Sequence, residues 1–166
     1  MQETPEDLDW LQCLLDDSYA AAGPHLRSIV GQERRLDAAG VVAELGAMRV
    51  MVLATTTARG EPRAGPVDGL FHRGRFHFGS GADSVRFRHI RARPAVSASV
   101  IEGERLQITV HGRARVLSPA TDPELAAFLI GVYGREAWDT WMSALPWARI
   151  DPERMLTFVN EAARET

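Results

Sequence analysis

The chain has 166 residues, a hydrophobic fraction of 45% and a formal net charge of −3. These values are those of an ordinary globular domain with a sizeable core, and they disfavour a nucleic-acid-binding protein, which is normally basic. The single cysteine excludes an internal disulfide, the acidic N-terminus lacks the basic region of a secretory signal, and no apolar run is long enough to span a membrane. We therefore expect one soluble, cytoplasmic domain over residues 1–166, with neither a nucleic-acid nor a membrane partner.

Charge is distributed unevenly along the chain. All 19 basic residues are arginines, so the abundance of arginine alone carries little information about function. Residues 59–115 contain 11 arginines and 5 acidic residues, whereas the segments on either side are net acidic. A basic centre between acidic flanks favours a local anion site over an extended nucleic-acid surface.

The N-terminal part is predicted to be helical. Residues 4–22 have apolar side chains at spacings of three and four, with Thr4 as the N-cap and Pro5 in the first helical position. Residues 37–45 form the second of two expected N-terminal helices, and His25–Ile29 is compatible with a further helical turn between them. We interpret residues 1–46 as a helical extension that precedes a β-barrel core over residues 47–160.

The periodicity then changes to that of β-strands. Six short segments with β-branched or alternating apolar residues are expected to be strands: Arg49–Thr57, Pro62–Phe71, Arg75–Gly79, Ala95–Ile101, Arg105–Leu117 and Met155–Asn160. Most are joined by turn-length connections, which favours antiparallel pairing in a barrel or a sandwich. Gly65-Pro66 interrupts the second strand, and a proline there indicates a sheet edge or a bulge. Helices are expected over Ala82–Ala92 and from Asp122 to Val132, and a tryptophan-rich segment follows.

The short helix after the third strand carries a candidate anion site. Ser80 and Ser84 place hydroxyl groups near its start, and Arg86 adds a fixed cation. The first N–H groups of a helix have no intrahelical partner, so a phosphate can bind there. Two structural interpretations stay open, because Ser80 and Asp83 have the spacing of a capping box and Arg86 can be a solvated surface charge.

An ordered set of motifs extends across residues 37–117. It consists of L-A-T-x-T-x-x-G-x-P, P-V, G-x-F-x-F-G-S, S-x-R, R-P and Q-x-x-x-x-G, which begin at Leu53, Pro66, Gly74, Ser84, Arg93 and Gln107. The set resembles the pyridoxamine 5′-phosphate oxidase-like family, the FMN-binding split β-barrels, with a weaker similarity over Ala148–Phe158. The resemblance implies a mainly β fold, a six-stranded antiparallel Greek-key split barrel with flanking helices. It also implies a homodimer with two cofactor sites at its interface.

The resemblance assigns cofactor-binding positions as well. In the family, the second strand passes its backbone along the flavin ring, while a hydroxyl after the third strand and a serine and a basic residue in the next helix hold the phosphate. A glutamine of the fifth strand approaches the ring, and an aromatic residue of the last strand covers the site. The matching positions here are Pro66, Val67, Asp68 and Gly69 for the ring, Ser80, Ser84 and Arg86 for the phosphate, and Gln107 and Phe158 for the remaining contacts. For Asp68, a turn or bulge residue is the structural alternative.

Gly65 and Leu70 stand where the oxidase proper has cofactor-contacting basic residues in its second strand. The C-terminal arginine and histidine with which the oxidase holds pyridoxal phosphate have no match after Phe158, and these departures imply a substrate other than pyridoxamine phosphate. The leading hypothesis is a flavin-dependent oxidoreductase that acts on an unidentified small molecule, with FMN or a deazaflavin (coenzyme F420) as cofactor. No catalytic side chain is assigned, because the cofactor would supply the chemistry. The alternative is a non-catalytic protein that binds or sequesters a flavin or haem.

Other common kinds of site find little support in the sequence. The spacings of His72, His77, His89 and His111 match no dedicated metal motif, so no metal site is expected. His77 and His111 are expected to point outward from their strands. The sequence has no G-x-S-x-G nucleophile elbow, which disfavours a hydrolase. The tryptophans of the C-terminal segment are expected to pack in the core or at a dimer interface.

Overall fold

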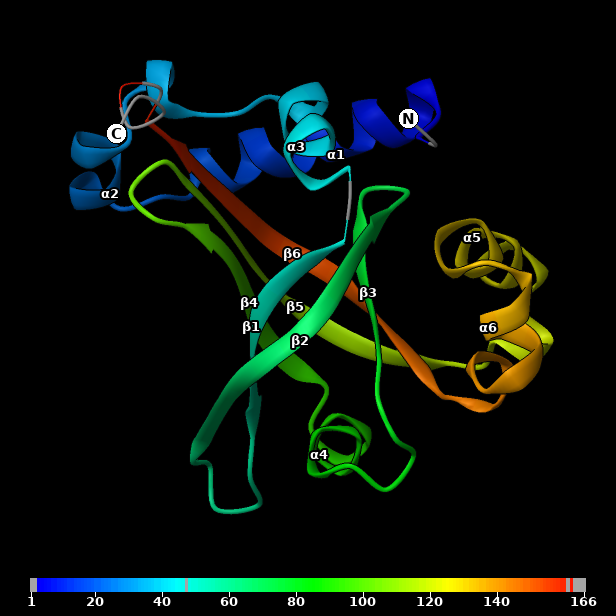
Figure 1. Ribbon diagram of the computed structural model, residues 1–166. Helices are drawn as coiled ribbons and strands as arrows, with labels where there is room; N and C mark the ends of the chain where they lie inside the picture. Colours follow the sequence, from blue (N-terminus) through cyan, green and yellow to red (C-terminus); the bar gives the residue numbers. More distant parts are fainter. Residues whose placement is uncertain (1–2, 47, 161, 163–166) are drawn as a thin grey trace.

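A closed barrel of six antiparallel strands forms the centre of the structure (Figure 1). The computed structural model describes residues 3–46, 48–160 and 162. In their order around the barrel the strands are β1 (Arg49–Thr56), β2 (Pro62–His72), β3 (Arg75–Gly79), β6 (Trp147–Val159), β5 (Leu106–Leu117) and β4 (Ala95–Glu102). β4 lies beside β1 after three consecutive strands, which is the Greek-key order. The expected fold class, a mainly β barrel with flanking helices, is confirmed.

Helices cover both ends and one side of this barrel. They are α1 (Pro5–Ala20), α2 (Pro24–Ile29), α3 (Ala38–Leu45), α4 (Val85–Ala92), α5 (Pro123–Tyr133) and α6 (Arg135–Thr140), with short 3₁₀ turns η1 (Gln32–Arg34), η2 (Pro119–Thr121) and η3 (Met142–Ala144). α1 and α3 lie against one end, α4 lies at the other end, and α5 and α6 lie beside β3 (Figure 1). Among the described helices, none is both long and apolar enough to cross a membrane.

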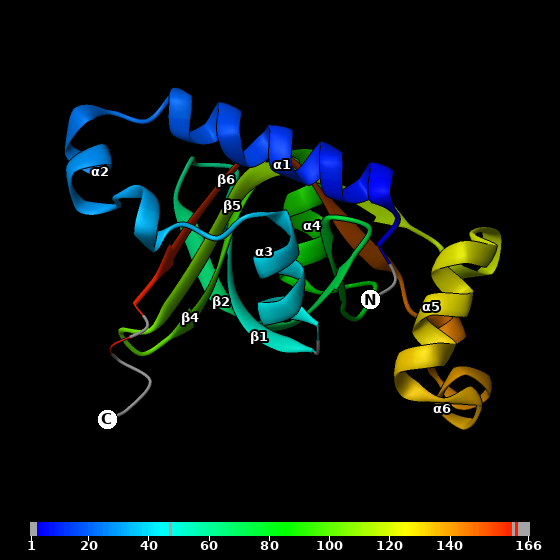
Figure 2. The same cartoon turned by 90° about the horizontal axis from the view of Figure 1, so that it is seen from above.

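Helix α1 closes a free edge of the barrel. The helix begins with the predicted N-cap, Thr4, which forms a reciprocal capping box with Asp7. β6 pairs with β3 only over residues 147–149, so the rest of that edge needs other partners. The hydroxyl of Ser18 accepts a hydrogen bond from the Met155 N–H (2.9 Å), and the hydroxyl of Tyr19 accepts one from the Thr157 N–H (2.8 Å). α1 crosses the barrel in Figure 2 and takes the place of a neighbouring strand along β6.

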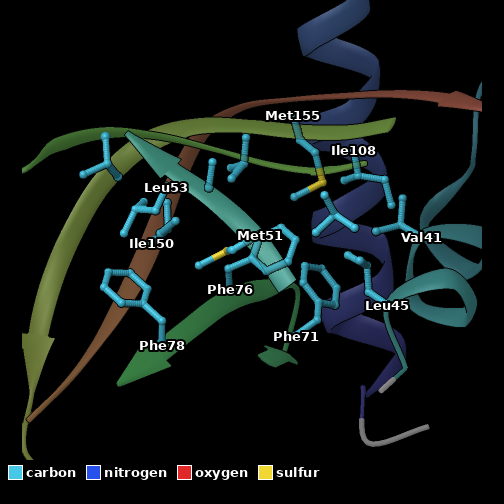
Figure 3. Close-up of a cluster of buried hydrophobic side chains, with 14 of the residues drawn as sticks. Val41, Leu45, Met51, Leu53, Phe71, Phe76, Phe78, Ile108, Ile150 and Met155 are labelled. Carbon is cyan, nitrogen blue, oxygen red and sulfur yellow. The ribbon is translucent and has the colours of Figure 1, made fainter. Parts of the chain in front are cut away.

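Two layers of apolar side chains hold the elements together. The first fills the barrel and extends to α1 and α3, with Phe76 and Phe78 of β3 facing Met51 and Leu53 of β1 (Figure 3). The second lies outside the barrel, where α5 and η3 cover the outer face of β2, β3 and β6. Its buried residues are Leu70, Leu125, Phe128, Leu129, Met142 and Trp147. The second layer fixes the position of α5 and η3 against the strands, which matters for the site.

Two boundaries differ clearly from the prediction, and the strand pairing decides between the two interpretations of Pro66. α4 begins at Val85 instead of Ala82, because Ser84 is its N-cap, so the expected capping box of Ser80 is wrong. β6 begins at Trp147, well before Met155. β2 runs without a bulge through Pro66, which pairs with Val52, and its opposite edge has no partner strand before Leu70. The proline therefore marks a sheet edge.

Candidate functional site

A groove of about 450 Å³ lies on the outer face of the barrel, and we call it the β2 groove. Its strand side comes from β2, from the end of β3 and from the start of β6. Its opposite wall comes from the last residue of α5 and from the segment between α6 and β6. The lining includes Pro66, Val67 and Asp68 of β2, Ser80 after β3, Trp147 of β6, and Tyr133 and Trp141 of the opposite wall.

The β2 residues predicted to bind a cofactor reach this groove by strand alternation. Pro66 and Asp68 point away from the barrel, while Val67 also packs against the interior layer. Asp68 is exposed and pairs with Val50 in a regular ladder, so its interpretation as a bulge residue is wrong. Gly69 faces inward and does not line the groove. A Cβ atom there would lie 2.9 Å from the Met51 sulfur, so packing explains this glycine.

The predicted phosphate residues lie next to one end of the groove. The Ser84 hydroxyl accepts a hydrogen bond from the Phe87 N–H (3.2 Å) and so caps α4. The N–H groups of Val85 and Arg86 have no hydrogen-bond partner among the described residues. The Nη2 atom of Arg86 donates to the Pro66 carbonyl (2.9 Å), which joins the start of α4 to the free edge of β2.

Arg86 carries a positive charge without a counter-charge. It forms no ion pair with any described carboxylate, and partial burial lowers the pKa of its guanidinium. A half-buried, unpaired cation beside free helix N–H groups is electrostatically suited to an anion. The geometry therefore supports an anion site at Ser80, Ser84 and Arg86, although Ser80 lies in the loop before the helix.

The other arginines of α4 shape the loop that leads to this site. Arg88 and Arg91 are both exposed. Arg88 donates to the Asp83 carbonyl (2.6 Å) and Arg91 to the Ala82 carbonyl (2.9 Å). Both bonds fold the loop of residues 80–84 back onto α4 and fix the start of the helix.

Aromatic rings form the wall opposite β2. The Tyr133 ring centroid lies 6.2 Å from that of Trp147 and 6.4 Å from that of Trp141, with interplanar angles of 58° and 71°. Trp147 is buried, whereas Trp141 is 50% exposed. Burial, and secondarily the Asp68 carboxylate, raises the pKa of Tyr133. Sequence reasoning noted the tryptophans but did not assign them to a groove, because the three rings converge only when α6 and η3 fold back onto β6.

Gln107 and Phe158 lie elsewhere. They pair with each other across β5 and β6 and line a second groove of about 320 Å³ beneath α2. The Arg34 guanidinium lies 5.7 Å from the centroid of the Phe158 ring. Figure 1 shows α2 and the end of β6 on the side of the barrel away from α5 and α6. One chain therefore brings Pro66, Val67, Asp68 and Ser80 to the β2 groove, with Ser84 and Arg86 beside it, and keeps Gln107 and Phe158 apart from it.

Two buried histidines lie under α5, near the β2 groove but outside it. His77 points outward from the barrel as predicted, yet α5 covers it. The His72 ring stacks on Phe128 at 4.1 Å, and neither of its nitrogens has a hydrogen-bond partner among the described atoms. The Nδ1 atom of His77 is 3.2 Å from the Arg75 carbonyl, which can only accept, so Nδ1 carries the proton. In the part of the chain that the structure describes, no three residues of metal-ligating type are grouped.

The six-stranded antiparallel barrel with flanking helices belongs to the class of split β-barrel proteins. Residues 39–164 match the family model described as pyridoxamine 5′-phosphate oxidase, and the chain belongs to this family. No functionally curated protein matches the chain.

Solved structures with a similar fold come from proteins that are described in different ways. A conserved hypothetical protein of Mycobacterium tuberculosis is 17% identical with a TM-score of 0.67, and the match covers 81% of this chain and 91% of that chain. An FAD-binding protein of Mesorhizobium loti is 23% identical with a TM-score of 0.58, over 75% and 93% of the two chains. HutZ, the haem storage protein of Vibrio cholerae, is 18% identical with a TM-score of 0.59, over 72% and 92%. At these identities the similarity shows the fold alone.

Proposed function

We propose that this protein is a flavin-dependent oxidoreductase that binds FMN at the β2 groove and acts on a small molecule. The observation that carries the proposal is the unpaired, half-buried guanidinium of Arg86 beside the free N–H groups of α4. It fits the phosphate of a phosphorylated cofactor, and the adjacent strand edge fits the family's use of Pro66–Gly69 along a ring. Bound flavin would supply the electron transfer.

The protein's own residues would bind and orient the cofactor. Arg86 holds the Pro66 carbonyl and so aligns the anion end with the strand edge. Ser80 and Ser84 supply hydroxyl groups, and the aromatic wall excludes water from the side opposite β2. Within the described groove lining, Asp68 is the one carboxylate and no histidine is present, so we assign no general acid or base.

Comparing FMN with riboflavin tests the assignment of the phosphate. Charge-assisted hydrogen bonds contribute about 1.5–3 kcal/mol each, so Arg86→Ala should weaken FMN binding about 10- to 100-fold. Riboflavin lacks the phosphate and should bind both proteins alike. Arg113→Ala, an exposed change on β5, is the control. An unchanged ratio of FMN to riboflavin affinity in Arg86→Ala would place the phosphate elsewhere.

The proposal includes a homodimer. Val50 and Val52 of β1 and Ile101 of β4 form an apolar strip on the outer face, with exposed fractions of 63%, 45% and 59%. The strip begins at the β2 groove, which Val50 lines, and reaches Ile101, which pairs with Gln107. A second copy on this strip would explain how Gln107 and Phe158 of one chain serve the groove of the other.

Sedimentation velocity tests this part of the proposal. The wild type should sediment as two chains, and Val52→Asp should sediment as one chain because a charge on the strip opposes burial. Val85→Asp, at an equally exposed valine on α4, should leave the mass unchanged. A monomeric wild type would remove the shared site.

The second candidate is a protein that binds or sequesters a flavin or haem without turnover. It is favoured by the lack of a match, after Phe158, to the arginine and histidine with which the oxidase holds its substrate. Leu70, in the place of a cofactor-contacting basic residue of the oxidase, is buried under α5. The absorption spectrum after adding FMN, the deazaflavin or haem in turn identifies the cofactor. Reduction and reoxidation of the bound flavin by a nicotinamide and a small electrophile would reject this candidate. The cytoplasmic location stays an expectation from the sequence.

A further inference from the structure

The aromatic wall of the β2 groove has features that packing alone does not explain. Three rings from separate segments, Tyr133, Trp141 and Trp147, are steeply inclined to one another. Trp147 forms the buried base, against which Gly79 packs so closely that a Cβ atom would lie 3.0 Å from the ring. Trp141 is half exposed at the groove, so a large part of its apolar surface is left for a ligand.

The part of the groove beside the aromatic wall carries a negative charge. Asp68 is the one charged side chain among the described residues that line it. Its carboxylate has no hydrogen bond or ion pair with any described side chain, and it is close enough to contribute to the raised pKa of Tyr133. Arg86 does not neutralise Asp68 by contact, since its recorded bond goes to the Pro66 carbonyl. An unpaired carboxylate and three aromatic residues therefore line the same groove.

We propose that the β2 groove binds a planar organic cation beside Asp68, against the exposed surface of Trp141. Aromatic faces attract cations through their quadrupole, and Trp141 is the ring of this wall with a large surface open to a ligand. Asp68 adds an opposite charge, while an anionic ligand would meet repulsion from both the carboxylate and the ring faces. The groove volume of about 450 Å³ admits a small ring compound.

The inference goes beyond the proposed function because cation binding requires no flavin and does not use the anion end. Both proposals use the β2 groove, where FMN would lie along Pro66–Gly69, but their tests change different residues, Asp68 and Trp141 here and Arg86 there. A failure of one test therefore leaves the other test intact.

Three ligands with the same ring separate charge from shape. Calorimetric titration of the flavin-free protein with 1-methylnicotinamide (a cation), nicotinamide (neutral) and nicotinate (an anion) should give at least tenfold tighter binding of the cation than of nicotinamide, with nicotinate weakest. Equal affinities, or tighter binding of nicotinate, in the unmodified protein would overturn the proposal without any variant.

Variants then locate the cation. Asp68→Asn keeps the size of the side chain and should abolish the preference for the cation over nicotinamide. Trp141→Ala should weaken the cation at least fivefold and remove the fluorescence quenching that accompanies binding. Glu104→Gln, an exposed carboxylate in the β4–β5 turn, is the matched control and should behave like the wild type. A preference that survives in Asp68→Asn would place the cation outside this groove.

Discussion

Because His72 and His77 are buried, we expect the protein to lose stability in mild acid. Burial, assisted by His72 and the nearby arginines, lowers the pKa of His77 from an ordinary 6.5 to about 3, and burial also lowers the pKa of His72. The folded state therefore favours the neutral His77 ring. Its contribution to stability is complete above the ordinary value of 6.5 and declines as the pH falls below it towards 3.

The magnitude follows from the difference in bound protons. At pH 5 the unfolded chain carries almost one more proton at this ring than the folded chain, and stability falls by about 1.4 kcal/mol per pH unit. From pH 7.5 to pH 5 the loss due to His77 is about 2 kcal/mol. The loss of stability at pH 5 depends mainly on the ordinary histidine pKa of 6.5, because the ring in the folded protein is still neutral at this pH. His72 adds a loss of the same sign.

Urea unfolding at pH 7.5 and pH 5, followed by circular dichroism, measures this contribution. His77→Gln can keep a donor for the Arg75 carbonyl but cannot titrate, so it should lose about 2 kcal/mol less than the wild type over the same pH range. His77→Phe serves the same purpose if the glutamine variant does not fold. His25→Gln, at an exposed position on α2, should retain the wild-type loss. If His77→Gln loses as much stability as the wild type, protonation of this ring does not limit the fold in acid.

Two further predictions test close packing at Gly112 and closure of the β6 edge by α1. Gly112→Ala should destabilise the protein by roughly 3 kcal/mol or more, because the new Cβ atom would lie 2.3 Å from a carbonyl oxygen of β6. Gly131→Ala on α5 meets open space and should stabilise it by up to about 1 kcal/mol, so equal effects in urea unfolding would contradict the packing argument. Tyr19→Phe should cost about 1–3 kcal/mol, because the buried N–H of Thr157 loses its acceptor. An unchanged urea midpoint would show that α1 does not close the edge of β6 through this bond.

The elements with strong local signals were predictable from the sequence. Thr4 and Asp7 form the capping box of α1, and the alternation of Phe76 and Phe78 identifies the interior face of β3. These signals depend on neighbours within a few residues, so no tertiary information is needed.

The first half of β6 was missed because its polar residues conceal the strand pattern. Arg149 and Asp151 bond to each other at 2.6 Å on one face, and Pro152 lies opposite the bulge at Gly112. Asp151 and Pro152 argue against a strand when read alone. The close approach of the two backbones at Gly112 accommodates them, and only the folded barrel shows it.

The position of the candidate site follows from where the barrel is incompletely paired. β2 pairs with β3 only over Leu70–His72, so its edge before Leu70 presents backbone groups without a strand partner. The Pro66 carbonyl faces this edge, because it accepts from Arg86, and in an antiparallel strand the backbone groups of Asp68 face the same way. At the corresponding edge of β6, Ser18 and Tyr19 satisfy the backbone.

At the β2 edge Arg86 supplies one donor. Beside this part of β2 lies the aromatic groove, whereas α1 covers the edge of β6. Pro66 and Asp68 are exposed, so their backbone groups at this edge are open to a ligand. A planar heterocycle that carries its own donors and acceptors, with a phosphate for Arg86, would satisfy them. The sequence can indicate the residues of this edge, but that the edge is open and that aromatic rings face it emerges only from the pairing of the strands.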